Sequence, residues 1–269
     1  MKIGFIGAGR MGSALIRSFL NAGIIRKEDV IAGDKDTEKL KLLSGIVATS
    51  TTDNREAVKK SDVVFLAVKP KEIVAVLGEV RDIVGGKLVV SIAAGVPTKL
   101  IDGELGGKAR VIRVMPNMPC IVGEGATAYS LGKNATKKDG ELVKKLFGAV
   151  GLAVELPEGA LDAVTGLSGS GPAYFYLIIK ALTEAGVKEG LPKNVAEKLA
   201  AQTAKGAGAM VLGSSKTPDE LIDAVRSPGG TTAEGLKVME EKKVSEVMVE
   251  AVKAATKRAR ELTKCSSKK

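Results

Sequence analysis

Short apolar runs and stretches of helical periodicity alternate over the first 156 residues. Apolar runs joined by helices are typical of a parallel sheet that is covered on both faces. The pattern predicts strands at Lys2–Ile6, Val30–Gly33, Val63–Ala67, Leu88–Ile92, Arg110–Met115, Ala126–Ser130 and Ala153–Leu156. It predicts helices at 13–22, 37–44, 54–60, 71–83, 98–104 and 137–149.

The strand pattern ends near Leu161, and the rest of the chain predicts helices only. These helices cover 161–189, 193–213, 217–225, 231–242 and 244–264. We therefore expect an α/β fold in which an N-terminal Rossmann-type, doubly wound sheet (1–158) is followed by an all-α dimerisation domain (159–269). The apolar run at 174–179 and the Ala and Gly residues between 200 and 209 favour burial against a second subunit. Burial against the chain's own first domain is the alternative.

A glycine-rich turn follows the first predicted strand at once. Its residues are Gly7, Ala8, Gly9, Arg10, Met11 and Gly12, and a helical pattern begins at Ser13. Strand, G-x-G-x-x-G turn and helix in this order are typical of a dinucleotide-binding unit. Gly7 allows the tight turn, Gly9 lets the backbone approach a pyrophosphate, and Gly12 lets the helix pack closely. The helix N–H groups would then face the phosphates. The alternative is an ordinary glycine-rich turn.

Two charged residues follow the second predicted strand. Asp34 lies 22 residues after Gly12, where an acidic residue hydrogen-bonds the adenosine ribose of NAD. Lys35 comes next and is a candidate for holding the 2′-phosphate of NADP. The two residues favour opposite cofactors, so we expect NADPH or NADH with modest discrimination. A plain turn at the end of a strand is the alternative.

Three further strand exits lie where ligands bind in open α/β sheets, beyond the carboxyl ends of the strands. The third predicted strand leads into Ala67, Val68, Lys69 and Pro70, with Pro70 set to begin the next helix. The fourth leads into Ala93 and Ala94, and both exits would let a cofactor lie against the backbone. Asn117 follows the fifth and is a candidate for bonding a carboxamide or ribose, or for making a turn.

Two glycine-containing turns precede helices in the second half. The segment from Leu167 to Tyr174 is a Gly/Ser loop that predicts an anion site or simply a capped helix start. The second turn holds Ser227, Pro228, Gly229, Gly230, Thr231 and Thr232. We expect Thr231 to cap the next helix and Glu234 to complete a capping box. Backbone donors, two hydroxyls and a helix dipole in one turn suit a small carboxylate.

Composition narrows the chemistry. The chain has 269 residues and no histidine, which excludes a Ser-His-Asp triad and a histidine-ligated metal; we expect no metal site. The net charge of +10 comes without basic patches interleaved with aromatic residues, so we expect no nucleic-acid partner. No apolar run reaches about 18 residues, which argues against a membrane span.

The start of the chain and its cysteines bear on the compartment. Because the first predicted strand begins at residue 2, we expect no signal peptide. Cys120 and Cys265 lie far apart in sequence and have no metal-ligand spacing. We interpret both as free thiols and expect a reducing cytoplasm.

The motifs together resemble pyrroline-5-carboxylate reductase over essentially the whole chain. The two specific ones run from Val164 to Tyr174 and from Ser227 to Thr232; the glycine turn, Ala67–Pro70 and Met115–Asn117 match as well. The resemblance implies NAD(P)H-dependent reduction of 1-pyrroline-5-carboxylate to L-proline, the last step of proline biosynthesis. It implies a helical domain that interlocks two subunits, and some members assemble these homodimers into decamers.

The resemblance also implies site residues. It places cofactor contacts at the glycine turn, at Asn54, at Ala67–Pro70 and at Ile92–Ala94. It places the substrate carboxylate at Ser227, Gly229, Gly230, Thr231 and Thr232, with Thr232 near the ring nitrogen as the candidate catalytic residue. Two positions depart from the family: Ala224 stands where members commonly carry Asn or Gln, and Asp34 where NADPH-preferring members are often uncharged.

The alternative is a related two-domain oxidoreductase that acts on an imine or a β-hydroxy acid. β-Hydroxy-acid dehydrogenases resemble this architecture, but they place a catalytic Lys four residues after the second glycine of a Gly-x-Gly motif. Here Phe175 stands at that spacing after Gly169-Ser170-Gly171. A phenyl ring cannot do acid–base chemistry, which disfavours that class.

Overall fold

The computed structural model describes residues 1–267 and divides into two compact units. Unit 1 comprises residues 1–170 together with residues 253–267, and unit 2 comprises Gly171–Val252. Residues 159–170 and the C-terminal stretch thus group with the sheet, whereas the sequence pattern places them in the helical domain. The expected order, an α/β sheet domain followed by a helical part, is confirmed.

Unit 1 is built on one eight-stranded sheet in the order β3-β2-β1-β4-β5-β6-β7-β8. All neighbours are parallel except β6 and β7. The first six strands therefore have the Rossmann order. Strands β2 and β3 are added on one side of β1 and strands β4 to β6 on the other, so the strand order reverses between β1 and β4. The strands are β1 (Ile3–Ile6), β2 (Val30–Gly33), β3 (Thr49–Thr51), β4 (Val63–Leu66), β5 (Leu88–Ser91), β6 (Arg110–Met115), β7 (Gly125–Leu131) and β8 (Gly151–Glu155).

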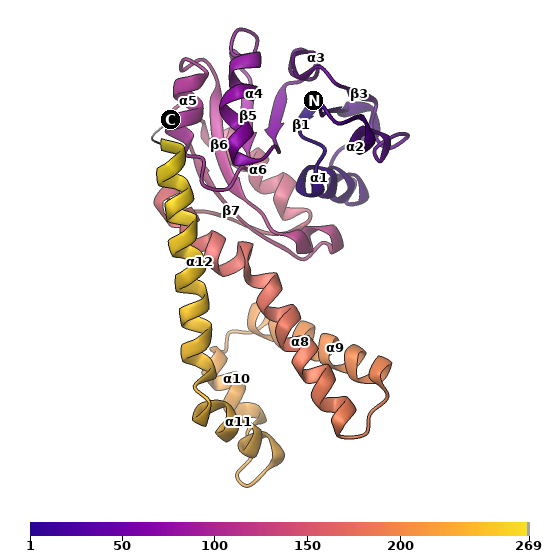
Figure 1. Ribbon diagram of the computed structural model, residues 1–269, viewed down its shortest axis with the longest axis vertical. Helices are drawn as coiled ribbons and strands as arrows, with labels where there is room; N and C mark the ends of the chain where they lie inside the picture. The colour runs from indigo at the N-terminus through magenta and orange to yellow at the C-terminus, as the bar shows by residue number, and fades with distance from the viewer. Residues whose placement is uncertain (268–269) are drawn as a thin grey trace. The chain divides into compact units, whose positions relative to one another are not determined.

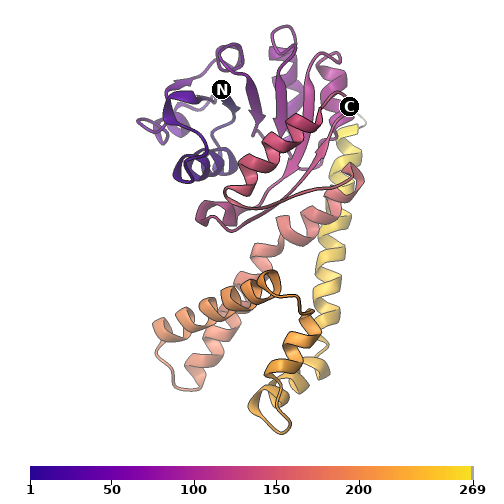
Figure 2. The same cartoon turned by 180° about the vertical axis from the view of Figure 1, so that it is seen from behind.

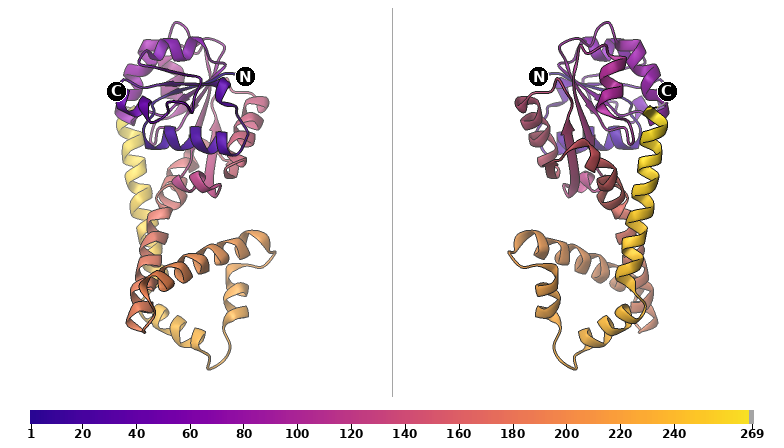
Figure 3. Two further views of the ribbon diagram at one scale, coloured as in Figure 1. Left: turned by 90° about the vertical axis from the view of Figure 1, so that its right-hand side faces the viewer. Right: turned by 90° about the vertical axis from the view of Figure 1, so that its left-hand side faces the viewer.

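Helices cover both faces of this sheet (Figures 1 and 3). Helices α1 and α6 lie on the face that Figure 2 turns toward the viewer, and α3, α4 and α5 lie on the other. The helices of unit 1 are α1 (Arg10–Asn21), α2 (Thr37–Lys41), α3 (Asn54–Lys59), α4 (Ile73–Val80), α5 (Thr98–Glu104), α6 (Lys137–Gly148) and α7 (Leu161–Val164). Short turns of other helix types are η1 (Lys27–Asp29), η2 (Pro70–Glu72), η3 (Met118–Val122), η4 (Glu158–Ala160) and the π-helical η5 (Thr165–Gly169).

The period of two in each strand divides the core into two clusters. Phe5 and Phe65 face α1 and α6, where they stack on each other at 4.6 Å between ring centroids. Phe19 and Phe147 meet edge to face at 5.4 Å in the same cluster. The alternate positions, among them Ile6, face the helices of the other layer. Because both faces are covered, the strands read as continuous apolar runs in the sequence.

Unit 2 is helical. Its elements are α8 (Gly171–Lys188), α9 (Lys193–Gly213), α10 (Pro218–Val225), α11 (Thr231–Glu241) and the first turns of α12 (Val244–Ser267). Helices α8 and α9 form a helical hairpin (Figure 1). Ala196 and Ala200 are the buried residues of α9, whereas neither α10 nor α11 buries any residue. Among residues 1–267, no helix is both long and apolar enough to cross a membrane.

A polar network attaches the end of α12 to the sheet. Arg113, buried in β6, donates to Asp162 at 3.1 Å and lies 3.6 Å from Glu158. The same Asp162 oxygen accepts the Thr263 hydroxyl of α12 at 3.0 Å. A buried guanidinium needs such carboxylate partners. This explains why the C-terminal part of α12 groups with unit 1.

Several element limits differ from the sequence pattern. The strand β3 is not predicted, because Thr-Ser-Thr has no apolar alternation. Helix α1 begins at Arg10 rather than Ser13, and the helix expected over 71–83 is a 3₁₀ turn followed by an α4 that ends at Val80. The helix expected over 161–189 is interrupted by the π-turn of η5. These are local departures, and the order of elements is unaffected.

Candidate active site

The glycine turn lies at the point where the sheet reverses its strand order. Gly7 follows β1, its N–H donates to the Gly33 carbonyl at 2.7 Å, and the Ala67 N–H donates to the Ile6 carbonyl at 2.7 Å. The exits of β1, β2 and β4 therefore lie side by side. Ligands of open α/β sheets bind at this crevice.

Two of the three glycines are required by close approaches of the backbone. Gly7 has a φ of +105°, and a Cβ there would lie 2.6 Å from the Ala67 carbonyl carbon. A Cβ on Gly12 would lie 2.2 Å from the Gly7 carbonyl oxygen. Gly9 differs, because a Cβ there would have no atom within 4 Å. The roles assigned to Gly7 and Gly12 follow from these contacts, and the space above Gly9 stays open to a ligand.

The start of α1 presents unused backbone donors. Gly9 is the N-cap residue and supplies no side chain, while Arg10, Met11 and Gly12 form the first turn. The first N–H groups of a helix have no partner within the helix, and the helix dipole is positive there. The Ser13 hydroxyl donates to the Ala8 carbonyl at 2.7 Å, which holds the turn closed. This helix end fits a pyrophosphate.

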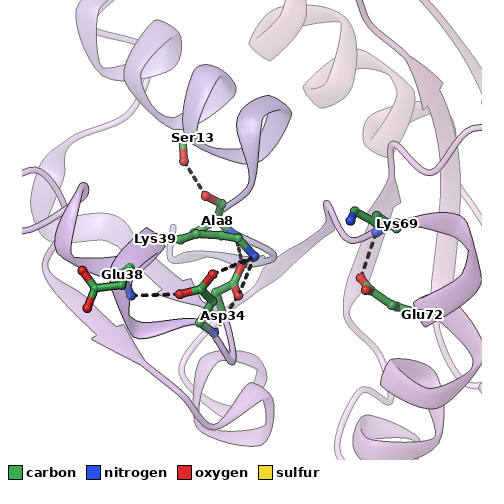
Figure 4. A network of polar contacts seen from close by, with 8 residues as sticks. Ala8, Ser13, Asp34, Glu38, Lys39, Lys69 and Glu72 are labelled. Atoms are coloured by element: carbon green, nitrogen blue, oxygen red, sulfur yellow. Dashed lines mark hydrogen bonds and ion pairs between the residues drawn. The ribbon is translucent and has the colours of Figure 1, made fainter.

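Asp34 is fixed by three groups of its own chain (Figure 4). Its carboxylate accepts the Ala8 N–H at 2.8 Å and the Asp36 N–H at 2.9 Å, and the Lys39 ammonium lies 3.3 Å away. Burial opposes the charge of Lys39, but the neighbouring Asp34 and Asp36 raise the pKa of that lysine. The same ammonium lies 3.5 Å from the other Asp34 oxygen, so each oxygen has one backbone N–H and Lys39 as partners. A ribose hydroxyl at Asp34 would take the place of one of these two long Lys39 contacts.

The two other candidates near β2 share one partner that the sequence did not reveal. Lys35 donates to a carboxylate oxygen of Glu79 in α4 at 2.6 Å. Asn54, at the start of α3, donates its amide N–H to the other oxygen at 2.7 Å. The hydrogen bond from Lys35 lowers the pKa of Glu79, and the bond to Glu79 raises the pKa of Lys35.

The exits of β4 and β5 consist of small residues and backbone. Ala67 and Val68 are half-buried, Lys69 and Pro70 are exposed, and Pro70 opens η2 as expected. The Lys69 N–H donates to Glu72 at 3.2 Å, which leaves the ammonium outside this bond (Figure 4). After β5, Ala93 is buried and Ala94 half-buried. The β4 exit borders the glycine turn through the contact of Gly7 with Ala67, and the Ile92 N–H donates to the Leu66 carbonyl at 3.1 Å, which places the β5 exit beside the β4 exit.

Asn117 is used structurally at both ends of its amide. The oxygen accepts the Ala126 N–H at 2.8 Å, and the nitrogen donates to the Ser168 carbonyl at 3.0 Å. The side chain is buried and holds η3, β7 and the π-turn η5 together. Of the two interpretations that the sequence left open, the structural one describes these contacts.

The turn expected to hold a carboxylate belongs to unit 2. Gly229 has a φ of +66°, and a Cβ on Gly230 would lie 2.4 Å from the Ser227 hydroxyl oxygen. Gly230 is the N-cap of α11, and no side chain caps it. The capping box of Thr231 and Glu234 is therefore a wrong prediction, because Thr231 is already the first helical residue.

Because no capping box forms, backbone N–H groups at the start of α11 remain available to a ligand. The Gly230 carbonyl accepts the N–H groups of Ala233 and Glu234, at 3.1 and 3.3 Å. The N–H groups of Thr231 and Thr232 come first in the helix, where intrahelical acceptors are lacking. Thr231 is exposed and Thr232 half-buried. The turn thus combines two backbone donors, two hydroxyls and a helix N-terminus.

The residues present at the exits of β1, β2 and β4 fit a dinucleotide. The Asn54 amide oxygen is buried and has no hydrogen-bond partner among the described residues. A hydroxyl donor of a ribose would satisfy it. Together with the open space over Gly9, this orphaned acceptor supports a nucleotide site built from unit 1.

Comparison with known proteins places the chain. The model for pyrroline-5-carboxylate reductase dimerisation matches residues 158–262, and the model for NADP oxidoreductase, coenzyme F420-dependent, matches residues 2–95. A pyrroline-5-carboxylate reductase of Methanosarcina acetivorans is 44% identical over 265 residues, which cover 98% of each chain. The chain belongs to the pyrroline-5-carboxylate reductase family.

Solved structures of pyrroline-5-carboxylate reductases have the same fold. The Plasmodium falciparum enzyme with NADP bound is 35% identical, with a TM-score of 0.90 and 98% coverage of each chain. The Coxiella burnetii enzyme is 38% identical, with a TM-score of 0.89, and the match covers 97% of this chain and 98% of that one. The Plasmodium falciparum structure holds NADP, which is one of the two cofactors expected here, and the expected dimerisation domain is confirmed by the family match over residues 158–262.

Proposed function

We propose that the protein catalyses the NAD(P)H-dependent reduction of 1-pyrroline-5-carboxylate to L-proline, the last step of proline biosynthesis. The observation that carries the proposal is the glycine turn at the strand-order reversal of a chain that is 44% identical, end to end, to a pyrroline-5-carboxylate reductase. The absence of histidine from the sequence is compatible with this reaction, because reduction of C=N needs no strong protein base.

Unit 1 supplies the cofactor site in this proposal. The N–H groups of Arg10, Met11 and Gly12 bind the pyrophosphate, and Asp34 and Asn54 accept ribose hydroxyls. The exits Ala67–Pro70 and Ala93–Ala94 line the rest of the site. When bound, the reduced nicotinamide supplies the hydride. The protein contributes binding, orientation and electrostatics.

Unit 2 supplies the substrate turn. The N–H groups of Thr231 and Thr232 and the hydroxyl of Ser227 hold the carboxylate, and the glycines Gly229 and Gly230 let the backbone make that turn. The Thr232 hydroxyl donates a hydrogen bond to the ring nitrogen as it becomes an amine. Thr232 is therefore the residue to which we assign the catalytic role.

The oligomer and the compartment are parts of the same proposal. The dimerisation domain and the exposed apolar residues of α8 and α9 support a homodimer, and the mass in solution distinguishes it from a decamer. Cys120 is a buried free thiol and Cys265 an exposed one. Free thiols support a reducing compartment, the cytoplasm.

A panel of substrates tests the activity. NADH and NADPH oxidation is measured with pyrroline-5-carboxylate, with other small cyclic imines and with open-chain 2-oxo acids, and reduction of NAD+ and NADP+ is measured with β-hydroxy acids. Turnover of pyrroline-5-carboxylate, and none of the 2-oxo acids or β-hydroxy acids, is expected, because Phe175 stands where the hydroxy-acid enzymes need lysine. Comparable turnover of a 2-oxo acid or a hydroxy acid would overturn the proposal.

A further inference from the structure

Glu79 links two residues of the proposed cofactor site. One carboxylate oxygen accepts the Lys35 ammonium at 2.6 Å, and the other accepts the Asn54 amide N–H at 2.7 Å. Lys35 follows β2 and Asn54 opens α3, so the carboxylate holds one residue from the β2 exit and one from the start of a helix. The side chain of Glu79 is about one-third exposed, at 34%.

The contact with Lys35 acts against a phosphorylated ribose. A cation that follows the second strand of a Rossmann fold is the group that accommodates a 2′-phosphate. Here that cation is paired with Glu79, and the carboxylate itself would repel a phosphate nearby. Both effects favour a cofactor whose ribose carries a free hydroxyl.

The contact with Asn54 works in the same direction. Because Glu79 takes the amide N–H, the amide presents its oxygen, which has no partner in the described chain. An oxygen accepts a hydrogen bond from a ribose hydroxyl but not from a phosphate oxygen, which carries no proton to donate. That oxygen lies 3.4 Å from where a Gly33 Cβ would be, at the end of β2.

We propose that Glu79 is a positioning residue that sets the discrimination between NADH and NADPH, in favour of NADH, by holding Lys35 and orienting Asn54. The inference rests on the proposed cofactor site and goes beyond it, because Glu79 touches the cofactor only through those two residues. It is not a catalytic residue.

Nucleotide binding without any imine substrate tests this. ADP-ribose and 2′-phospho-ADP-ribose are titrated calorimetrically into the full-length protein and its Glu79→Gln variant. Glutamine keeps an oxygen acceptor for Asn54 but loses the charge that holds Lys35. The variant is expected to bind 2′-phospho-ADP-ribose about threefold to tenfold more tightly, with ADP-ribose within about twofold of the wild type.

Two control variants isolate the role of Lys35. Asp82→Asn removes a carboxylate three positions further along, which pairs with Arg55 through two contacts of 2.6 Å. It is expected to leave the ratio of the two dissociation constants unchanged. In a Lys35→Met background, Glu79→Gln is expected to lose most of its gain, because the cation is gone.

A third variant tests the role of Asn54. Glu79→Ala removes the amide acceptor as well as the charge, so ADP-ribose is expected to bind severalfold more weakly than it binds to Glu79→Gln, while 2′-phospho-ADP-ribose binding stays within about twofold of that variant. An unchanged ratio in Glu79→Gln, an equal shift in Asp82→Asn, or a full gain in the Lys35→Met background would each overturn the proposal. Failure of the wild type to bind either nucleotide would overturn the cofactor site itself, whereas failure to reduce pyrroline-5-carboxylate would leave this result standing.

Discussion

The two units of the chain bury very different kinds of residue. Unit 1 has two large apolar clusters, one of which contains four phenylalanines at 0% exposure. Unit 2 buries small residues, Ala196 and Ala200, while Phe175, Tyr176 and Leu177 are 57%, 62% and 66% exposed. Large exposed apolar patches mark interaction surfaces. Unit 1 therefore has the core of an independent domain, and unit 2 has the surface of an interface.

This difference separates two sources of stability. The core of unit 1 depends on contacts within one chain, so its contribution is independent of protein concentration. The stability of unit 2 depends on what covers α8 and α9, so mass action controls it if the cover is a second copy. The predictions below test this comparison, beginning with the largest effect.

Truncation of a buried and of an exposed phenylalanine should behave differently. Phe65→Ala opens a cavity between Phe5 and Phe147 and should lower the free energy of unfolding by about 3–5 kcal/mol at any protein concentration. Phe175→Ala should cost most stability at concentrations where the wild type is fully dimeric, and the cost should shrink toward zero as the protein is diluted below the dissociation constant of the dimer. Urea unfolding followed by circular dichroism at several concentrations measures both. A concentration-independent loss in Phe175→Ala would contradict the assignment of this surface to an interface.

Whether a glycine substitution in α9 raises or lowers stability can show whether a second subunit covers this helix. A Cβ on Gly208 would have no atom within 4 Å in the chain. If the surface were open to water, Gly208→Leu would stabilise the helix by up to about 1 kcal/mol. Under a second subunit it overpacks the interface and should cost about 1–3 kcal/mol. We expect the loss, measured as a lower thermal midpoint and a smaller dimer fraction.

Gly78→Leu in α4 is the matched control. Gly78 is exposed, helical and equally free of neighbours within 4 Å, but it belongs to unit 1. The control should be neutral or stabilising. Stabilisation by both variants, or a monomeric wild type at micromolar concentration, would remove the argument for an interface on α9.

Much of unit 1 could be predicted from the sequence. The limits of β2 and β6 agree to the residue, because apolar runs and the residues that end them are local signals. The glycine turn and Asp34 were identified from spacing alone. The polar strand β3 carries no such signal, and it exists through its pairing with Ile31 to Gly33.

Other features depend on long-range contacts that no local pattern encodes. The C-terminal part of α12 packs with unit 1 and makes a hydrogen bond between Thr263 and Asp162, which are 101 residues apart in the sequence. The link of Glu79 to Lys35 spans 44 residues, and its link to Asn54 spans 25. The capping box at Thr231 failed for a different reason: Gly230 takes the cap position, and a local motif does not determine where the helix begins.

Removal of the Thr232 hydroxyl tests whether unit 2 contributes to catalysis. Thr232→Val keeps the shape of the side chain and removes the hydroxyl, and it should lower kcat and kcat/KM by about tenfold to a hundredfold, equivalent to roughly 1–3 kcal/mol. Thr232 belongs to unit 2, whose stability is expected to depend on a second copy of the chain. Wild-type activity itself should therefore fall upon dilution below the dimer dissociation constant. A higher KM with unchanged kcat would reduce Thr232 to a binding residue. If kcat and KM both stay unchanged, the turn that contains Thr232 is not part of the active site.

The smallest effect is expected at Asp34, in the unit with its own core. Asp34→Ser removes the charge beside the ribose site and releases Lys39, whose ammonium lies 3.3 Å from the carboxylate. The ratio of kcat/KM for NADPH to that for NADH should rise by about threefold to tenfold, roughly 1 kcal/mol. Dinucleotide binding requires unit 1 only, so the shift in nucleotide affinity should be the same at every protein concentration.

Asp36→Ser is the control for this last prediction. It removes a carboxylate 3.6 Å from the same Lys39 ammonium, and serine can still cap α2. Asp36 does not touch Ala8, however, whereas Asp34 accepts the Ala8 N–H at 2.8 Å and so lies against the glycine turn. A smaller shift in Asp36→Ser than in Asp34→Ser therefore identifies Asp34 as the residue beside the ribose. Equal shifts would mean that the field around Lys39, and not a contact from Asp34, discriminates between the cofactors.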